Sequence, residues 1–200
     1  MGRAAGWLRR PFGEGLGCGT TTHVEGAGMS DAPADSAYVA ALWEHPDLCV
    51  ALFGVQFHAE EGRRLYEEAG INDEMFQALE TARGEGLLLN RPLMSPEGPV
   101  LLQYWRSYDD LDKWARKQPH SRWWRWLMEH PKRIGFYHEI YQAKAAEAIY
   151  EEGTHPVGPA LFSSLQRVRG GEGHSRDRQR QFTEVSSEAK PGPKSGGDLR

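Results

Sequence analysis

The sequence predicts an α+β domain whose elements follow the ferredoxin-like order β-α-β-β-α-β. Three features predict this fold. There are four strand-like segments, and two helical regions separate the first strand from the second and the third from the fourth. A tight turn joins the second strand to the third. A length of 200 residues suits one such domain with extensions at its ends. In this fold the helices lie on one face of a four-stranded sheet.

The first strand and the first helix are predicted from their apolar patterns. Residues 48–57 are apolar on both alternating faces, which is typical of a central strand buried on two sides. Asn72 and Asp73 can cap a helix that we expect over roughly 73–83. Apolar residues recur there at helical spacing, and Gly84 ends the pattern.

The second and third strands form a predicted hairpin. Residues 86–93 and 98–106 are both rich in apolar side chains, and they flank the segment Ser95-Pro96-Glu97-Gly98. Proline at the second turn position and glycine at the fourth suit a type I turn. We therefore expect these two strands to be antiparallel neighbours.

The second helical region contains two start signals. Ser107 and Asp110 form an S-x-x-D signal, and Pro119 opens a further helical stretch that ends before Pro131. One face of this stretch carries large side chains, which we expect in the core or in a subunit contact. They are Trp123, Trp126, Leu127 and His130.

The fourth strand is expected at residues 134–141, and a short fifth piece at 148–151. The first, third and fourth strands are apolar on both faces, whereas the helices cover only one face of the sheet. The simplest cover for the second face is another copy of the chain, which predicts a homodimer with the architecture of a dimeric α+β barrel. A cover made by the chain's own segment 153–168 is the alternative.

The two ends of the chain differ in composition from the middle. Residues 1–35 hold eight of the 23 glycines and few large apolar groups, so we expect a disordered leader there. A start at Met29 is the alternative interpretation of this segment. Residues 169–200 are also poor in large apolar side chains and are expected to form a disordered tail. The folded domain is then expected over residues 36–168.

Charge, hydropathy and cysteine content exclude several classes of protein. The 24 Lys and Arg against 28 Asp and Glu leave a net charge of −4, which does not favour a nucleic-acid partner. The longest apolar stretch is shorter than the roughly 20 residues that a membrane helix needs, so no membrane partner is expected. Cys18 and Cys49 have neither metal-ligand nor disulfide spacing. Their scarcity favours a reducing compartment, and we expect a cytoplasmic protein.

Several blocks of residues resemble a known family. The blocks are Pro99-Val-Leu-Leu-Gln-Tyr-Trp-Arg-Ser-Tyr-Asp-Asp-Leu111, Ala115-Arg116, Pro119-His120, Trp124, Gly135-Phe-Tyr-His-Glu-Ile-Tyr141 and Ala148-Ile-Tyr150. They resemble a monooxygenase-like family of mostly uncharacterised proteins in the dimeric α+β barrel superfamily, which includes antibiotic-biosynthesis monooxygenases. The resemblance covers roughly residues 48–162. The segment Gln56-Phe-His-Ala departs from the family pattern, in which a more basic, Asn-containing segment follows the first strand.

The resemblance implies a cofactor-independent monooxygenase that uses O₂ and a small apolar or aromatic substrate. Such a substrate is a phenol or an enol, as in polyketides, and its anion passes an electron to O₂. The protein then has to supply a dry apolar cavity, a base of near-neutral pKa and donors that hold the anion. A histidine is the simplest such base.

His138 is the first candidate for this base, because it interrupts an apolar face of the fourth strand. On a strand the next residue points the opposite way, so Glu139 cannot form a local dyad with it. The structural alternatives are a hydrogen-bonded core histidine at His138 and, at Glu139, a surface residue or a partner of Arg116. Glu139 and Tyr137 are candidate substrate-binding residues.

Four further candidates come from the third strand and the second helical region. Arg106 is a candidate catalytic residue that steadies an anion, or it pairs with a carboxylate such as Asp109 or Asp110. His120 is a candidate catalytic residue at the cavity mouth, or an exposed residue at a helix start. Tyr104 and Trp105 are candidate substrate-binding residues on opposite faces of the strand, and packing is the alternative role of Trp105.

No metal or nucleotide cofactor is predicted. The histidines are scattered without an i, i+4 pair or an H-E-x-x-H motif, and no glycine-rich loop follows a strand and opens a helix. Some barrels of the resembled superfamily bind haem through one histidine. A haem-binding protein with His138 as ligand is therefore one alternative function. A non-catalytic barrel that binds a small apolar ligand is the other.

Overall fold

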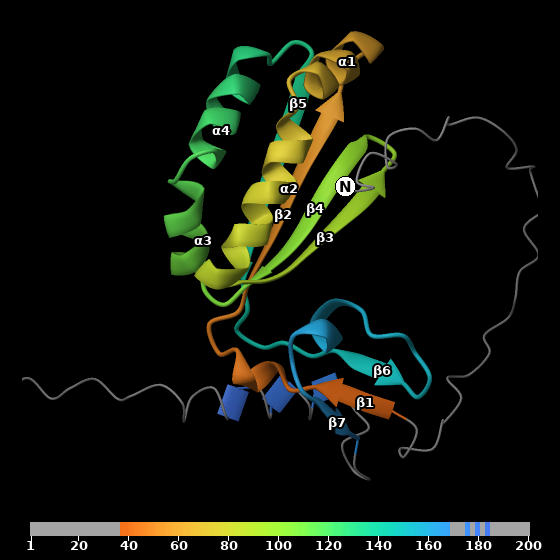
Figure 1. Cartoon of the computed structure of the whole chain (residues 1–200). Helices are drawn as coiled ribbons and strands as arrows, with labels where there is room; N and C mark the ends of the chain where they lie inside the picture. The colour runs from red at the N-terminus through yellow and green to blue at the C-terminus, as the bar shows by residue number, and fades with distance from the viewer. Residues whose placement is uncertain (1–36, 169–174, 177–178, 181–182, 185–200) are drawn as a thin grey trace, which may run out of the picture. The chain divides into compact units, whose positions relative to one another are not determined.

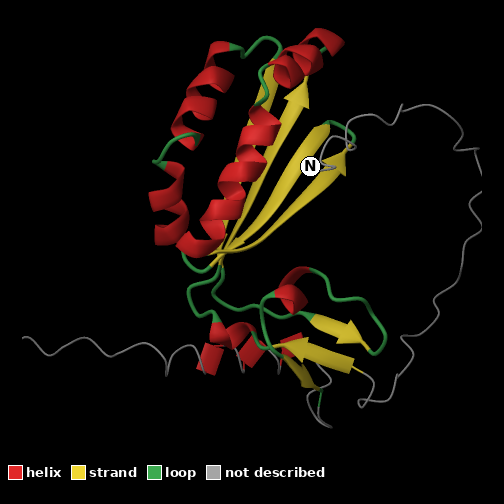
Figure 2. Cartoon of the chain, in the orientation of Figure 1, coloured by secondary structure: helices red, strands yellow, loops and turns green. Residues whose placement is uncertain are grey.

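The computed structural model describes residues 37–168, 175–176, 179–180 and 183–184. Its main sheet has antiparallel strands in the order β3-β4-β2-β5. These strands are β2 (Cys49–Phe57), β3 (Leu87–Ser95), β4 (Gly98–Trp105) and β5 (Ile134–Gln142). The helices are α1 (Glu60–Glu68), α2 (Ile71–Ala82), α3 (Tyr108–Ala115) and α4 (His120–Glu129). Helices α2, α3 and α4 lie over one face of the sheet, and α1 lies near the ends of β2 and β5 (Figures 1 and 2).

This arrangement confirms the predicted ferredoxin-like α+β fold. The four predicted strands form the main sheet, with boundaries that differ from the prediction by one or two residues. The hairpin of β3 and β4 closes at Ser95 and Gly98, which are paired. Ser107 caps α3, because its Oγ accepts a hydrogen bond of 3.1 Å from the backbone N–H of Asp110. Helix α2 begins at Ile71, two residues before the predicted start, after Gly70 in the left-handed conformation.

Helix α1 was not predicted from the sequence pattern. Its nine residues, EEGRRLYEE, are mostly charged and carry too few apolar groups to show a helical period. The helix is held instead by tertiary contacts. Tyr66 is 2% exposed, and its hydroxyl donates a hydrogen bond of 2.9 Å to Asn72 Oδ1. Gly62 lets the helix approach the backbone before β5, since a Cβ there would lie 2.2 Å from the oxygen of Arg133.

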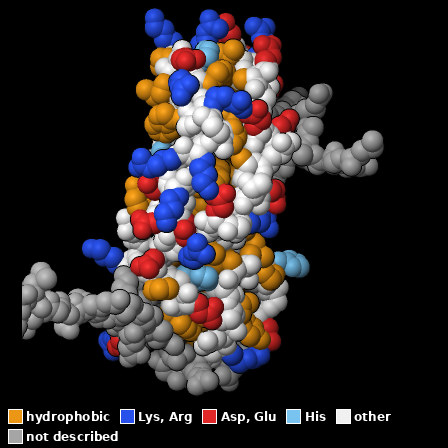
Figure 3. Space-filling model, turned by 60° about the vertical axis from the view of Figure 1, so that its left-hand side comes forward, with side chains coloured by type: hydrophobic (Ala, Val, Ile, Leu, Met, Phe, Trp, Pro, Cys, Tyr) orange, Lys and Arg blue, Asp and Glu red, His pale blue; other side chains and the backbone are white. Residues whose placement is uncertain are grey.

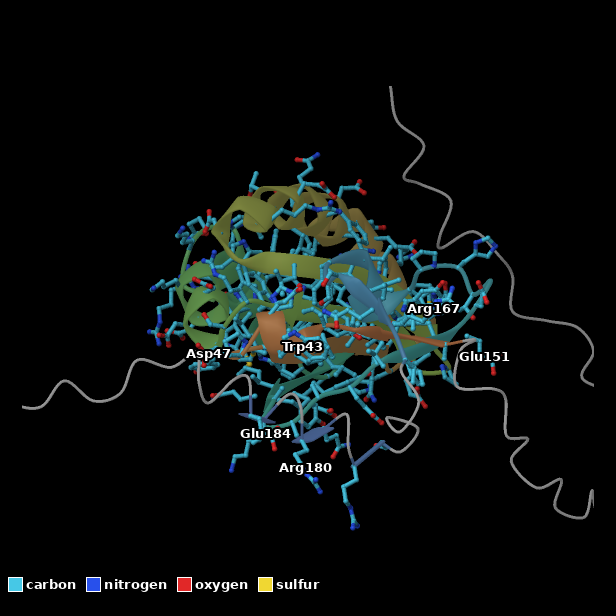
Figure 4. All side chains as sticks on the ribbon, turned by 90° about the horizontal axis from the view of Figure 1, so that it is seen from below. Trp43, Asp47, Glu151, Arg167, Arg180 and Glu184 are labelled. Carbon is cyan, nitrogen blue, oxygen red and sulfur yellow. The ribbon has the colours of Figure 1, made fainter. Side chains whose placement is uncertain are left out.

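A small antiparallel sheet has the order β6-β1-β7. Its strands are β1 (Ala37–Ala40), β6 (Ile149–Glu151) and β7 (Leu165–Arg167). Strand β6 corresponds to the predicted fifth piece, whereas β1 and β7 are too short to show an alternating pattern. Trp43 packs with the apolar cluster beside this sheet and lies toward the middle of Figure 4, whereas Glu151 and Arg167 lie at the rim of that view.

The main core lies between the helices and the sheet. Trp105 is fully enclosed there, and Trp123 and Leu127 are buried beside it on α4. Trp126 and His130, from the same predicted face, pack with tilted rings whose centroids lie 4.4 Å apart. Of the two roles expected for this face, Trp123 and Leu127 therefore have the core role.

The face of the main sheet that points away from the helices is also largely apolar. The pairing register places Val50, Leu52 and Leu102 on this face. Residues 158–162 cover one end of it, where the rings of Phe162 and Tyr104 lie 5.3 Å apart. Leu93, on the same face, remains 39% exposed. The chain's own segment thus covers part of this face, and a second copy of the chain remains a prediction.

The helical side of the molecule carries charges of both signs. Figure 3 shows Lys and Arg side chains interspersed with Asp and Glu, with apolar side chains between them. Several of these charges pair within one helical turn, as Arg116 does with Asp112 at 2.8 Å. No helix among the described residues is long and apolar enough to cross a membrane. The leader predicted for 1–35 and most of the tail predicted for 169–200 lie outside the described residues, and both remain predictions.

Two neighbouring residues of α4 test the core assignment. Leu127 is 2% exposed and Met128 is 58% exposed. We expect Leu127→Ala to lower the free energy of unfolding by about 2–5 kcal/mol, since it removes buried methyl groups and leaves a cavity. Met128→Ala, the control, should change it by less than about 0.5 kcal/mol. Urea unfolding followed by far-UV circular dichroism measures both, and equal effects would contradict the assignment.

Candidate active site

A cavity lies between the helices and the helix-facing side of the main sheet. It has room for a few waters, and its empty space, which includes the part open to solvent, is about 540 Å³. A larger ligand therefore has to occupy the open side as well. The lining residues are Phe53, Ile71, Met75, Leu101, Gln103, Leu111, Trp114, Ala115, His120, Trp123, Trp124, Leu127 and His138.

Aromatic rings dominate the lining. Trp114 comes from α3, Trp123 and Trp124 from α4, and Phe53 from β2. The indole N–H of Trp123 is satisfied, because it donates a hydrogen bond of 2.9 Å to Glu74 Oε2. Trp124 is 40% exposed and therefore reaches the surface. Such a lining favours flat, apolar ligands that can stack on the rings.

The polar side chains of the lining, apart from the indole N–H groups, are Gln103, His120 and His138. They come from β4, α4 and β5, respectively. Among the described residues, no Lys, Arg, Asp or Glu lines the cavity. The described residues also contain no group of three or more His, Cys, Asp or Glu side chains that could hold a metal ion.

His120 has a defined tautomer. Its Nδ1 lies 2.9 Å from the backbone oxygen of Ala115. A carbonyl only accepts hydrogen bonds, so Nδ1 carries the proton and Nε2 of the neutral ring is an acceptor. The ring packs beside Trp114 and Trp123, at centroid distances of 5.0 and 6.2 Å.

The pKa of His120 lies below its usual value. Burial is the main cause, the bond to Ala115 opposes it, and the charge that His138 can carry lowers the pKa further. A histidine of lowered pKa is neutral at pH 7 and can accept a proton. The site therefore contains one base that is ready to act at neutral pH.

His138 lies on β5, opposite Phe53 of β2 in the pairing register. Its ring centroid is 6.3 Å from that of Phe53 and 6.5 Å from that of Trp124. The residue is exposed and so lies at the open side of the cavity. Loss of hydration beside these rings lowers its pKa as well. The structure thus places both predicted histidines, His120 and His138, at one cavity.

Arg106 and Trp105 do not line the cavity. The guanidinium of Arg106 forms an ion pair of 2.8 Å with Asp110, which is the structural alternative stated for it above. This pairing raises the pKa of Arg106 and lowers that of Asp110. Trp105 is fully buried, and its ring packs 5.4 Å from that of Trp114. Its alternative role, packing, is the one that its position fits.

Tyr104, Tyr137 and Glu139 lie on the opposite face of the sheet, because their strand positions alternate with those that face the helices. The ring of Tyr137 covers Gly54, where a Cβ would lie 2.1 Å from it. Glu139 accepts a hydrogen bond of 2.6 Å from the Tyr141 hydroxyl and is not a partner of Arg116. These three candidates therefore do not meet the two histidines.

Sequence reasoning missed Gln103 and the tryptophans of the lining. Gln103 is 6% exposed, and its Oε1 accepts a hydrogen bond of 3.1 Å from the Trp105 indole N–H. A signal was present, because Gln103 is the polar residue between Leu101 and Trp105 on one face of an apolar strand. The tryptophans carried no comparable signal, since helical spacing predicts a buried face but not a hollow beside it.

Comparisons with known proteins connect this geometry to a family. A profile of the family described as monooxygenase af470-like matches residues 49–158. No protein of curated function is significantly similar in sequence. Two crystal structures of aldoxime dehydratase, one of them OxdRE in complex with butyraldoxime, have 17% identity and a TM-score of 0.50. They cover 76% and 82% of this chain.

The chain spans less than half of these aldoxime dehydratases, 44% and 48% of their lengths. SnoaB, a cofactor-independent oxygenase from Streptomyces nogalater, has 13% identity and a TM-score of 0.35 over 50% of this chain and 96% of its own. At such identities the solved structures concern the fold alone. The family profile extends from β2 through β6 and thus includes every strand of the main sheet and every lining residue of the cavity. The chain belongs to the monooxygenase af470-like family.

Proposed function

We propose that the protein is a cofactor-independent monooxygenase that acts on a small aromatic or enolic substrate of polyketide type. The observation that carries the proposal is His120, a buried base of defined tautomer in a cavity lined by aromatic and aliphatic side chains. Membership of a monooxygenase family supports the reaction class. The neutral, apolar lining supports a substrate that enters uncharged and ionises only when bound.

The proposed reaction needs no group besides substrate and O₂. A base removes the proton of the phenol or enol hydroxyl, and the resulting anion passes one electron to O₂. The substrate radical and superoxide combine to form a C–O bond, which gives a hydroperoxide after protonation. Cleavage of its O–O bond, with loss of a proton from the same carbon, releases water and leaves a carbonyl. Substrate and O₂ thus yield the quinone or ketone and one water.

We assign the proton-accepting role to Nε2 of His120, because Nδ1 is engaged by Ala115. His138 lies at the open side and is proposed to pass the proton on to solvent. The position of both rings at one cavity supports this relay. Arg106, Tyr104, Tyr137 and Glu139 receive no role in this reaction, and Trp105 does not contact the substrate, because none of them lines the cavity.

The histidines provide the first test. We expect His120→Ala to lower oxygen consumption with a panel of phenolic and enolic polyketides by about 100- to 10,000-fold, the usual contribution of a general base. His138→Ala should lower it less. His130→Ala is a matched control, because the His130 Nδ1 also contacts a backbone oxygen of α4, that of Trp126, but the residue lies outside the cavity.

Unchanged oxygen consumption in both His120→Ala and His138→Ala would contradict the catalytic assignment. If the panel compounds bind without any oxygen consumption in the unaltered protein, the result favours the non-catalytic binding barrel instead. Isothermal titration of the same compounds separates these outcomes.

Haem fits the cavity poorly. A haem ligated by His138 would need cations for its propionates, but the described residues that line the cavity include no Lys or Arg. We therefore expect no Soret band in the purified protein. When haem is added, we expect no shift of its Soret band that depends on His138. A Soret shift abolished by His138→Ala would contradict the cofactor-independent reaction.

We also propose that the protein is a homodimer formed through the helix-free face of the main sheet. Support comes from the apolar side chains of this face, which residues 158–162 cover only at one end. We expect a dimer in light scattering at micromolar concentration, and Leu52→Glu should shift it to the monomer. Leu165→Glu, on the small sheet and already 42% exposed, is the control. A folded, monomeric unaltered protein would contradict the proposal.

A further inference from the structure

Gln103 presents a hydrogen-bond donor that nothing in the described chain uses. The side chain is 6% exposed and lines the cavity. Its partner, the Trp105 indole N–H, can only donate, so the Gln103 atom at 3.1 Å has to be the oxygen. The other end of the amide is then the NH₂ group. It has no hydrogen-bond partner among the described residues.

The NH₂ group opens onto the cavity. It is not among the fully buried polar atoms without a partner, so a cavity water can meet it, and a ligand oxygen can take the place of that water. On the same face of the sheet, Leu101 and Trp105 offer no acceptor oxygen on their side chains. Asn90, opposite Gln103 on β3, has a buried Oδ1 without a partner, but no hydrogen bond joins it to this NH₂ group. A ligand that brings an oxygen into the cavity would give the NH₂ group an acceptor.

We propose that the Gln103 NH₂ group holds the oxyanion of the ionised substrate, and that Trp105 is the positioning residue that turns this amide toward the cavity. The inference rests on the proposed function and deepens it. It specifies a substrate whose phenolate or enolate oxygen reaches β4 while its ring lies among the tryptophans of α3 and α4.

The Gln103 donor is important for stabilising the anion because the described lining residues carry no cationic side chain. No Lys or Arg of the described part of the chain lines the cavity, so the developing negative charge is met there by neutral donors and by a histidine that has just been protonated. Hydrogen bonds to charged groups in a poorly hydrated site are stronger than those to neutral groups. An oriented neutral donor also leaves the uncharged substrate free to enter, which a buried cation would not favour.

A purely structural role for Gln103 makes a different prediction. If Gln103 serves only to satisfy the Trp105 N–H, Gln103→Leu affects the binding of an anionic ligand and of its neutral analogue alike, because no bond to the ligand is lost. If Gln103 is the oxyanion donor, Gln103→Leu weakens the binding of the anion alone. Gln103→Glu removes the donor and also adds a buried negative charge that repels the anion, so it is expected to weaken binding of the anion further.

The test measures binding of 4-nitrophenolate and of 4-nitrotoluene, a neutral analogue without the oxygen, to the full chain. Binding is followed by absorbance at a pH where the phenol is ionised. We expect Gln103→Leu to weaken phenolate binding about 10- to 100-fold, the usual effect of a lost bond to a charged group, and Gln103→Glu to weaken it further. Affinity for 4-nitrotoluene should stay unchanged in both. Gln142→Glu, a strand glutamine outside the cavity lining, is the control.

Trp105→Phe tests the positioning role and supplies a second variant if Gln103→Glu does not fold. It keeps the Gln103 amide but frees it to rotate, so we expect a smaller loss of phenolate binding with unchanged 4-nitrotoluene binding. If the ratio of 4-nitrophenolate affinity to 4-nitrotoluene affinity is unchanged in the Gln103 and Trp105 variants, the inference is wrong, although the cavity still binds ligands as proposed. Failure of the unaltered protein to bind either probe would overturn the pocket and the proposed function with it.

Discussion

The alternation of side chains along β4 is the constraint on which the rest of the site depends. Successive residues of a strand point to opposite faces of its sheet. Leu101, Gln103 and Trp105 therefore face the helices, whereas Leu102 and Tyr104 face away. A run of residues that is contiguous in sequence is thereby divided between two environments, one beside the cavity and one on the helix-free face. A side chain on the second face cannot reach the first, because the hydrogen-bonded sheet lies between them.

The helices complete the cavity with groups that the strands do not provide. His120 begins α4, and its ring is bonded to the carbonyl of Ala115, where α3 ends. The turn between these helices therefore sets both the position of the base and its tautomer. The surrounding indole rings exclude water, and this loss of hydration is the main reason that the pKa of each cavity histidine is lowered. The packing of the core and the chemistry of the site thus have one physical origin.

Parts of the fold and of the site could be predicted from the sequence. The remaining parts could not be predicted, and one physical reason accounts for all of them. The cap at Ser107 and the turn at Ser95–Gly98 act within a few residues, so their signals are complete in the chain itself. Helix α1 depends on the burial of Tyr66 by residues elsewhere, and its own pattern is too charged to predict it. Both cavity histidines were among the candidates, but Gln103 was not.

Local pattern alone predicted the hairpin and the four strands of the main sheet, because periodicity and turn chemistry are properties of neighbouring residues. Tertiary packing decided which face of β4 meets the helices, and so separated Tyr104 from Gln103. It also brought His120 of α4 and His138 of β5 to one cavity and gave His120 its bond to Ala115. These relations join residues from different elements through space, and no short-range pattern in a single chain encodes them.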